Sequence, residues 1–133
     1  MAGARAVRKL IDARSDLSID VLVVWIPVLS SDDLKAARSD AELFSGTRVR
    51  QFWDAKRSLG IDIASSVSVE PSPIAWDIYL FYDPGALFGH RAPTPLEWVH
   101  QLYGAAPGRY RGGRIDSGLK DLADQLFPPA RSP

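Results

Sequence analysis

Asp77 and His100 are the two side chains whose chemistry is best suited to catalysis. Asp77 lies within the apolar run of residues 74–82, where a desolvated carboxyl group has a raised pKa suited to proton transfer. His100, with His90 and Glu97, could supply two nitrogens and a carboxylate to a divalent metal ion. This spacing matches no metal motif, and we predict no metal site. The alternatives are an outward-facing Asp77 at a sheet edge and a His100 that simply faces the sheet.

Three arginines form a second group of candidate binding residues: Arg109, Arg111 and Arg114, which are interleaved with glycines. A guanidinium group binds phosphate or carboxylate through two parallel hydrogen bonds, and it can also contact an acidic protein surface. Tyr103 and Tyr110 lie nearby in the sequence and are suited to protein contacts. The loop is therefore a candidate site for an anion or a protein partner. The alternative is a solvated loop without a ligand.

A third candidate site is the segment from Trp25 to Asp33. Trp25 and Pro27 end an apolar stretch, and the serines and aspartates that follow offer capping groups for a helix. A helix N-terminus attracts anions because its backbone N–H groups are unpaired. Asp32 and Asp33 would occupy those groups and repel an anion. Structural capping, or attraction of a cation, are the alternatives.

The composition excludes several classes of function. The chain of 133 residues contains no cysteine, which excludes disulfides, thiolate nucleophiles, cysteine-ligated zinc and iron–sulfur clusters. Lysine plus arginine and aspartate plus glutamate number 16 each, so no net positive field favours nucleic acid. No cofactor is implied. The length suits one compact domain.

No segment of the sequence is typical of a membrane span or a secretion signal. The most apolar stretch, residues 19–29, is interrupted by Asp20 and Pro27 and is too short to cross a bilayer as a helix. A polar lead with several aspartates precedes it, unlike a signal peptide. We therefore expect a cytoplasmic protein with no membrane partner.

The first elements that must position these residues are a helix and a strand. Residues 4–14 carry apolar side chains at helical spacing, which predicts an amphipathic helix. Residues 19–25 are almost continuously apolar, which predicts a central strand covered on both faces. Pro27 cannot donate to a ladder, so the strand should end there.

The middle of the chain carries two helical patterns and one weak strand pattern. Residues 34–44 can form a helix, and residues 47–60 show a second apolar face at helical spacing. Gly60 suits a helix C-terminus. Alternating apolar residues then predict a short edge strand between residues 60 and 70.

The last part of the sequence indicates a hairpin followed by a helix. Residues 74–82 predict a strand, Asp83-Pro84-Gly85 a turn, and residues 96–103 a returning strand. Residues 104–113 predict a loop. A final helix begins near Asp116 or Ser117, with a buried stripe formed by Leu119, Leu122, Ala123 and Leu126.

The order of these elements resembles the thioredoxin-like superfamily. In that family a strand ends in a tryptophan directly before a Cys-x-x-Cys motif, and here Trp25 is followed by Ile26-Pro27-Val28-Leu29. The family also has a cis-proline beside that turn, before a strand that leads into a hairpin. Pro73, residues 74–82 and Asp83-Pro84-Gly85 look like that arrangement. The resemblance implies an α/β fold with a thioredoxin-like central mixed sheet flanked by helices, in one domain of residues 1–127 with a C-terminal tail of residues 128–133.

A closer resemblance is to a group of bacterial thioredoxin-like proteins without an established activity. It rests on four phrases: Val24-Trp25-Ile26-Pro27-Val28-Leu29, Gln51-Phe52-Trp53-Asp54, Trp76-Asp77 and Tyr82-Asp83-Pro84-Gly85. Because the redox motif is absent, the resemblance implies a non-redox binding or adaptor module.

Two functions are therefore expected from the sequence. The first is binding of a protein partner, either through the turn at Trp25 and Pro27, with Pro73 beside it, or through the Arg109–Arg114 loop. The alternative is a thiol-independent enzyme, or a protein that binds a metal or small ligand, using Asp77 and His100.

Overall fold

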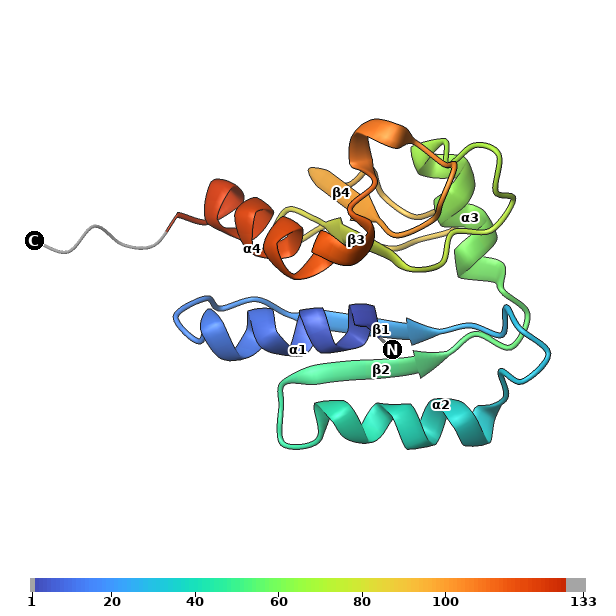
Figure 1. The fold of residues 1–133 in the computed structure, drawn as a ribbon, viewed down its shortest axis with the longest axis horizontal. Helices are drawn as coiled ribbons and strands as arrows, with labels where there is room; N and C mark the ends of the chain where they lie inside the picture. Colours follow the sequence, from blue (N-terminus) through green and yellow to red (C-terminus); the bar gives the residue numbers. More distant parts are fainter. Residues whose placement is uncertain (1, 129–133) are drawn as a thin grey trace, which may run out of the picture.

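The computed structural model describes residues 2–128, which form a mixed α/β protein (Figure 1). None of the described helices is long and apolar enough to cross a membrane. The helices and strands, in chain order, are α1 (Ala2–Ala13), β1 (Val21–Trp25), α2 (Leu34–Ala41), η1 (Glu42–Phe44), β2 (Val49–Trp53), α3 (Ser58–Val67), β3 (Ile78–Phe81), β4 (Glu97–His100), η2 (Pro107–Arg109), η3 (Gly112–Arg114) and α4 (Ile115–Leu126), where η marks a 3-10 helix.

The strands form two separate pairs in the described residues. β1 and β2 are parallel, with Val21 opposite Val49, and β3 and β4 are antiparallel. A strand does form within residues 19–25, as predicted, and in the described residues it has one partner strand and not two. β1 pairs on one side only, and Leu22 is 45% exposed. Continuous hydrophobicity reports burial of most side chains, but it does not report how many neighbours a strand has.

Strand β2 replaces most of the helix predicted at residues 47–60. Val49, Phe52 and Trp53 fit helical spacing, but the observed burial alternates, with Arg50 and Phe52 exposed and their neighbours less exposed. The segment pairs with the strongly β-forming residues of β1. This tertiary partner overrides the local helical pattern, as is common for short amphipathic segments.

Helix α3 replaces the edge strand predicted between residues 60 and 70. The alternation of Ile61 and Ile63 suggested a strand, but Gly60, Ile63 and Ala64 are the buried residues. Their spacing of three and four is that of one helix face. The exposed fraction of Ile61, 51%, shows that it lies off this face.

The C-terminal half agrees more closely with the sequence-based predictions. β3 and β4 lie within the two predicted strands, although β3 begins only at Ile78, and α4 buries Leu119, Leu122 and Ala123 as expected. The predicted loop at residues 104–113 contains the 3-10 helix η2 and the start of η3. The predicted tail lies outside the described residues except for Pro128.

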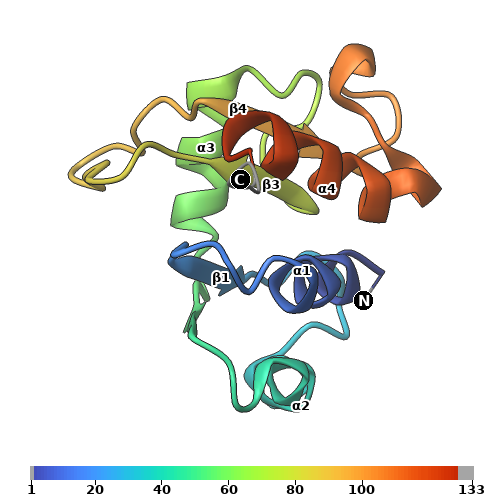
Figure 2. The same ribbon diagram turned by 90° about the vertical axis from the view of Figure 1, so that its left-hand side faces the viewer.

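Helix α1 connects the two strand pairs. Its buried residues Ala6 and Leu10 pack with Leu119 and other apolar residues of α4 and β4. In the other direction, Arg8 Nη1 donates to the carbonyl oxygen of Leu43, 2.9 Å away, in η1. Figure 2 shows α1 beside β1, with α4 above it. The helix therefore contacts both halves of the fold.

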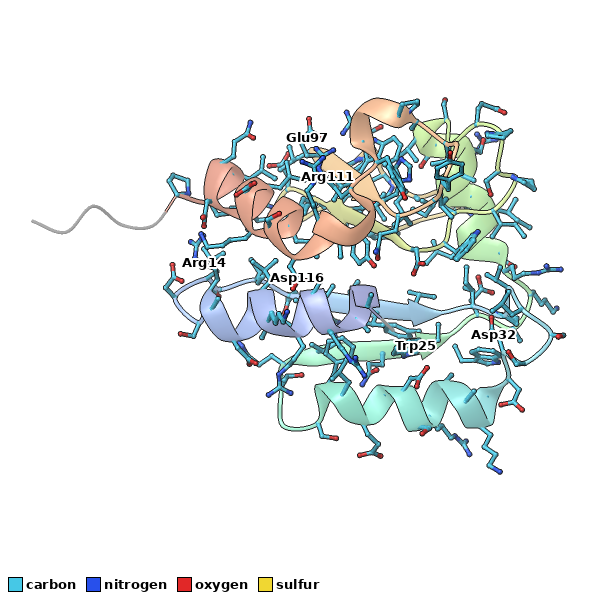
Figure 3. The ribbon with its side chains drawn as sticks, viewed as in Figure 1. Arg14, Trp25, Asp32, Glu97, Arg111 and Asp116 are labelled. Atoms are coloured by element: carbon cyan, nitrogen blue, oxygen red, sulfur yellow. The ribbon has the colours of Figure 1, made fainter. Side chains whose placement is uncertain are left out.

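Arg14 follows directly after α1 and joins this end of the helix to α4. Its side chain is 7% exposed and lies between α1 and α4 (Figure 3). The guanidinium group donates to Asp16 at 2.9 Å, to Asp124 at 2.6 Å and to the carbonyl oxygen of Phe127 at 2.8 Å. Lys9 and Asp116 form a further ion pair between the same two helices.

The Arg14 network predicts a loss of stability in acid. Hydrogen bonds from Arg14 lower the pKa of Asp16, and those from Lys120 and Arg14 lower the pKa of Asp124. A carboxyl group with a lowered pKa in the folded state stabilises the fold above its unfolded pKa of about 3.9 and loses that contribution as the pH falls. We expect Arg14→Met to be less stable than the native chain at pH 7, and the difference to shrink as the pH falls from about 4 to about 2. Urea midpoints measured across this range test the prediction, and parallel curves for the two proteins would contradict it.

Candidate functional site

The turn after β1 is closed by two carboxylates of its own chain. Asp32 Oδ2 accepts the backbone N–H groups of Val28 at 2.9 Å and Leu29 at 2.7 Å. Asp33 is the N-cap of α2 and accepts the N–H of Ala36 at 2.7 Å. These bonds occupy N–H groups that an anion would need, and the two negative charges repel it. The structure therefore places Asp32 in a structural role within the turn.

The same turn presents two large apolar side chains to solvent. Leu29 is 64% exposed and Leu34 is 42% exposed. The N–H of Leu29 is held by Asp32, so this exposed side chain extends from a fixed backbone. Sequence reasoning missed both leucines as site residues. The available signal is the polar Ser-Ser-Asp-Asp segment between them, which keeps the turn at the surface.

Trp25 lies under the turn and links three elements. Its indole Nε1–H donates to Gln51 Oε1 at 3.0 Å, and Gln51 Nε2 donates to the carbonyl oxygen of Ala41 at 3.2 Å. β1, β2 and the end of α2 are joined by this chain of bonds, and the indole lies on the side of the strands where α2 runs (Figure 3). Trp25 and Pro27 are half-buried. Trp25 thus fixes the base of the turn, and sequence reasoning did not single out Gln51 as its partner.

The turn lies next to the segment that precedes β3. A Cβ atom placed at Gly60 of α3 would lie 2.9 Å from Ile74 Cγ2 and 3.2 Å from Ile26 Cδ1. Both isoleucines therefore contact the same point on α3, and each lies beside one of the predicted site prolines, Pro27 or Pro73. The structure brings these two segments together.

Pro73 follows a cis-proline closely in the sequence. In the described residues the cis peptide bond joins Glu70 to Pro71, two residues before Pro73. Pro73 itself is exposed, and it is available to a partner beside the turn.

His100 is held inside the fold by both ring nitrogens. Its Nδ1 accepts the N–H of Leu102 at 3.0 Å, and its Nε2 donates to the carbonyl oxygen of Ala106 at 3.1 Å. The residue is 0% exposed. Neither nitrogen is left to bind a metal or to transfer a proton. Within residues 2–128, no group of three His, Asp or Glu side chains has an arrangement that could hold a metal ion.

Asp77 lies apart from His100. Its backbone has a φ of 47°, in the left-handed region, and its carboxyl group makes no hydrogen bond with the described residues. Although the residue is exposed overall, desolvation raises the pKa of Asp77, and burial together with Asp77 raises the pKa of Tyr79. Asp77 precedes β3, and its neighbour Ile78 is the residue opposite His100. No hydrogen bond joins the Asp77 carboxyl group to His100, whose ring nitrogens bond Leu102 and Ala106. The two predicted catalytic residues are not brought together.

The three arginines have three different environments. Arg109 pairs with Glu97, donates to the carbonyl oxygen of Trp98 at 2.9 Å and lies 4.7 Å from the centre of the Trp98 ring. Its hydrogen bond lowers the pKa of Glu97. Arg111 donates to two backbone carbonyl oxygens at 3.1 and 3.3 Å. Arg114 is exposed and makes no side-chain hydrogen bond with residues 2–128.

Arg111 and Arg114 line a shallow hollow of about 250 Å³ beside the start of α4. Ser117, Gly118 and Asp121 complete its lining. The Asp121 carboxylate reduces the attraction of this hollow for an anion. The sequence suggests a cluster of three arginines that could bind a ligand together. In the structure Arg109 and Arg111 are bonded within the fold, so the loop does not form such a cluster.

These features define a cysteine-free α/β protein. Its best-formed surface site is the turn after β1, where Asp32 and Asp33 bond backbone N–H groups and two leucines are exposed. Comparison with family models, curated proteins and solved structures finds no match to the chain.

Proposed function

We propose that this chain is a non-redox, thioredoxin-like binding module that contacts a partner protein through the turn after β1. The proposal rests on two properties of this turn: bonded backbone N–H groups and exposed leucine side chains. Its N–H groups are occupied by Asp32 and Asp33, while Leu29 and Leu34 are exposed. Such a turn is unsuited to an anionic ligand and suited to an apolar pocket on another protein.

The thioredoxin-like architecture is part of this proposal. Two features support it: the order of the elements, and the contact of Ile26 and Ile74 with Gly60, which brings the turn beside the Pro73 segment. The finer architecture is one mixed sheet in which β1 lies next to β3. β1 lies between β2 and the β3–β4 hairpin in Figure 1 and is nearer to the hairpin than β2 is.

The backbone directions of the strands also support this architecture. Asp54 N–H donates to the carbonyl oxygen of Trp25, so the backbone groups of Trp25 point to β2. Because the direction alternates from residue to residue along a strand, the backbone groups of Leu22 and Val24 face away from β2. Gln101 N–H donates to the carbonyl oxygen of Asp77, so the backbone groups of Asp77 point to β4. Because the direction alternates along a strand, the backbone groups of Ile78 and Leu80 face away from β4. Each strand pair thus has an unused edge available to the other.

The alternative function, an enzyme that uses Asp77 and His100, has less support. The strained backbone and raised pKa of Asp77 are typical of functional carboxylates. Its intended partner His100 is fully buried and has both nitrogens bonded. The geometry therefore favours binding through the turn.

We expect Leu29→Asp to weaken partner binding by about tenfold or more, because a buried contact residue would become a desolvated charge. A photo-reactive amino acid at position 29, in the cells that make the protein, identifies the partner that touches this turn. The affinity of that purified partner is then measured for the native chain and for Leu29→Asp. Leu87→Asp is the matched control, because Leu87 is 84% exposed in a different loop. Equal affinities for all three chains would contradict the proposal.

A further inference from the structure

Strand β2 has one edge without a partner. The N–H group of Asp54 points to β1, where it donates to the carbonyl oxygen of Trp25. Backbone groups alternate in direction along a strand, so those of Arg50 and Phe52 also point to β1. Those of Val49, Gln51 and Trp53 point the opposite way, and within residues 2–128 β2 pairs with β1 alone. The outer edge of β2 therefore offers unused N–H and C=O groups at alternate residues.

Nothing in the sequence of β2 blocks this edge. The strand Val49–Trp53 contains no proline, and its only charge is Arg50. Edge strands that stay monomeric are usually protected by proline, by several charges or by a covering element. One face of the β1–β2 pair also remains apolar and open, since Leu22 is 45% exposed and Phe52 is 52% exposed. Figure 2 shows α1 and α2 together on one side of these strands.

We propose that the occupant of this edge is a second copy of the chain, whose β2 pairs antiparallel with the first about a two-fold axis at Gln51. Gln51 then faces its own copy in a hydrogen-bonded pair, as its outward backbone groups require. Val49 faces Trp53 of the other copy in the same way. The four strands form one continuous sheet, and the exposed leucine and phenylalanine of both copies lie on one face.

The side chains of β2 are self-complementary in this register. Arg50 of each copy lies opposite Phe52 of the other in a non-hydrogen-bonded pair, where cross-strand side chains are closest. A guanidinium group against an aromatic ring is attractive, and this contact occurs twice. A two-fold axis at Arg50 would instead oppose two arginines. An axis at Phe52 would pair Arg50 with Asp54, whose carboxylate already accepts the N–H of Leu59 at 2.7 Å.

Other properties of the chain are compatible with this pairing. The formal net charge is zero, so two copies do not repel each other at long range. Helix α2, on the other face, has two short side chains that are not buried in its own copy: Ala36 is exposed and Ala41 is half-buried. Two copies of α2 related by the axis can therefore approach closely, since interhelical distance depends on side-chain size.

The test is the oligomeric state of the native chain and of variants at Arg50 and Phe52. Sedimentation equilibrium should show a concentration-dependent dimer with a dissociation constant on the order of 1–100 µM, as expected for a small interface. Phe52→Arg places arginines opposite each other and should weaken the dimer by about tenfold or more. The swapped double variant Arg50→Phe with Phe52→Arg restores both pairs and should recover native affinity.

Matched controls separate this interface from any other surface. Leu87→Arg adds the same charge in a distant loop and should leave the dimer unchanged. Val49→Pro removes an outward N–H while leaving the N–H groups that face β1, and it should abolish pairing. Equal urea midpoints, measured at a protein concentration below the dissociation constant so that every chain is monomeric, show that the variants are folded. A native chain that is monomeric throughout this concentration range, or a dimer unaffected by both Phe52→Arg and Val49→Pro, would overturn the proposal.

Discussion

Replacement of His100 by leucine is expected to lower the free energy of unfolding by about 2–4 kcal/mol. The imidazole is fully buried and bonds two backbone groups, the N–H of Leu102 and the carbonyl oxygen of Ala106. Leucine has a similar volume but can bond neither group. Each buried backbone group left without a partner costs about 1–3 kcal/mol, part of which is regained through the more apolar side chain.

Urea unfolding of the purified variant measures this change directly. His90→Leu is the matched control, because His90 is exposed, and its effect should stay within about 0.5 kcal/mol. The pair of variants also separates the two interpretations of His100. A structural histidine gives a destabilised protein, whereas a catalytic histidine gives a fully stable protein without activity. Native stability in His100→Leu would therefore contradict the structural role.

The sequence predicts the elements whose patterns are unambiguous. The helix at residues 4–14 and the helix that carries Leu119 and Leu122 both show apolar residues at a single period, and both form. The hairpin follows from two β-rich runs around Asp83-Pro84-Gly85. These predictions succeed because local pattern and tertiary packing favour the same structure.

The sequence fails where two periods fit the same residues. Val49, Phe52 and Trp53 match a helix, but Arg50 and Phe52 also match the exposed face of a strand. The choice is made by β1, more than twenty residues earlier in the chain. A short segment cannot reveal a distant partner, and for this reason the β1–β2 pair was not predicted.

The sequence indicates the segment that forms the candidate site, but it does not indicate the two exposed leucines of that segment. The segment from Trp25 to Asp33 does form an ordered turn, because Asp32 and Asp33 are capping residues by chemistry. The exposure of Leu29 depends on the direction in which the turn leaves the sheet, and a sequence carries no direct signal for that. The sequence pairs Asp77 with His100 by their chemistry alone, but both ring nitrogens of His100 are bonded to the backbone of Leu102 and Ala106.

The largest loss of stability is expected from Leu119→Ala. Leu119 is 1% exposed and packs in the cluster that joins α1, α4 and the β3–β4 hairpin. Truncation of a buried leucine to alanine costs about 2–5 kcal/mol, which is a large part of the stability of an ordinary domain. Because α1 also contacts the β1–β2 half through Arg8 and Leu43, a cavity at Leu119 weakens the element that connects both halves.

Leu126→Ala on the same helix is the matched control for Leu119→Ala. Leu126 is only half-buried, so its truncation removes fewer contacts and leaves a smaller cavity. We expect a smaller loss of stability in Leu126→Ala, and a single cooperative transition in the native chain. Because α1 contacts both halves, Leu119→Ala should also weaken the coupling between their unfolding, which appears as a broader urea transition with a lower slope. An equal effect of both variants would show that the α1–α4 contact does not hold the two halves together.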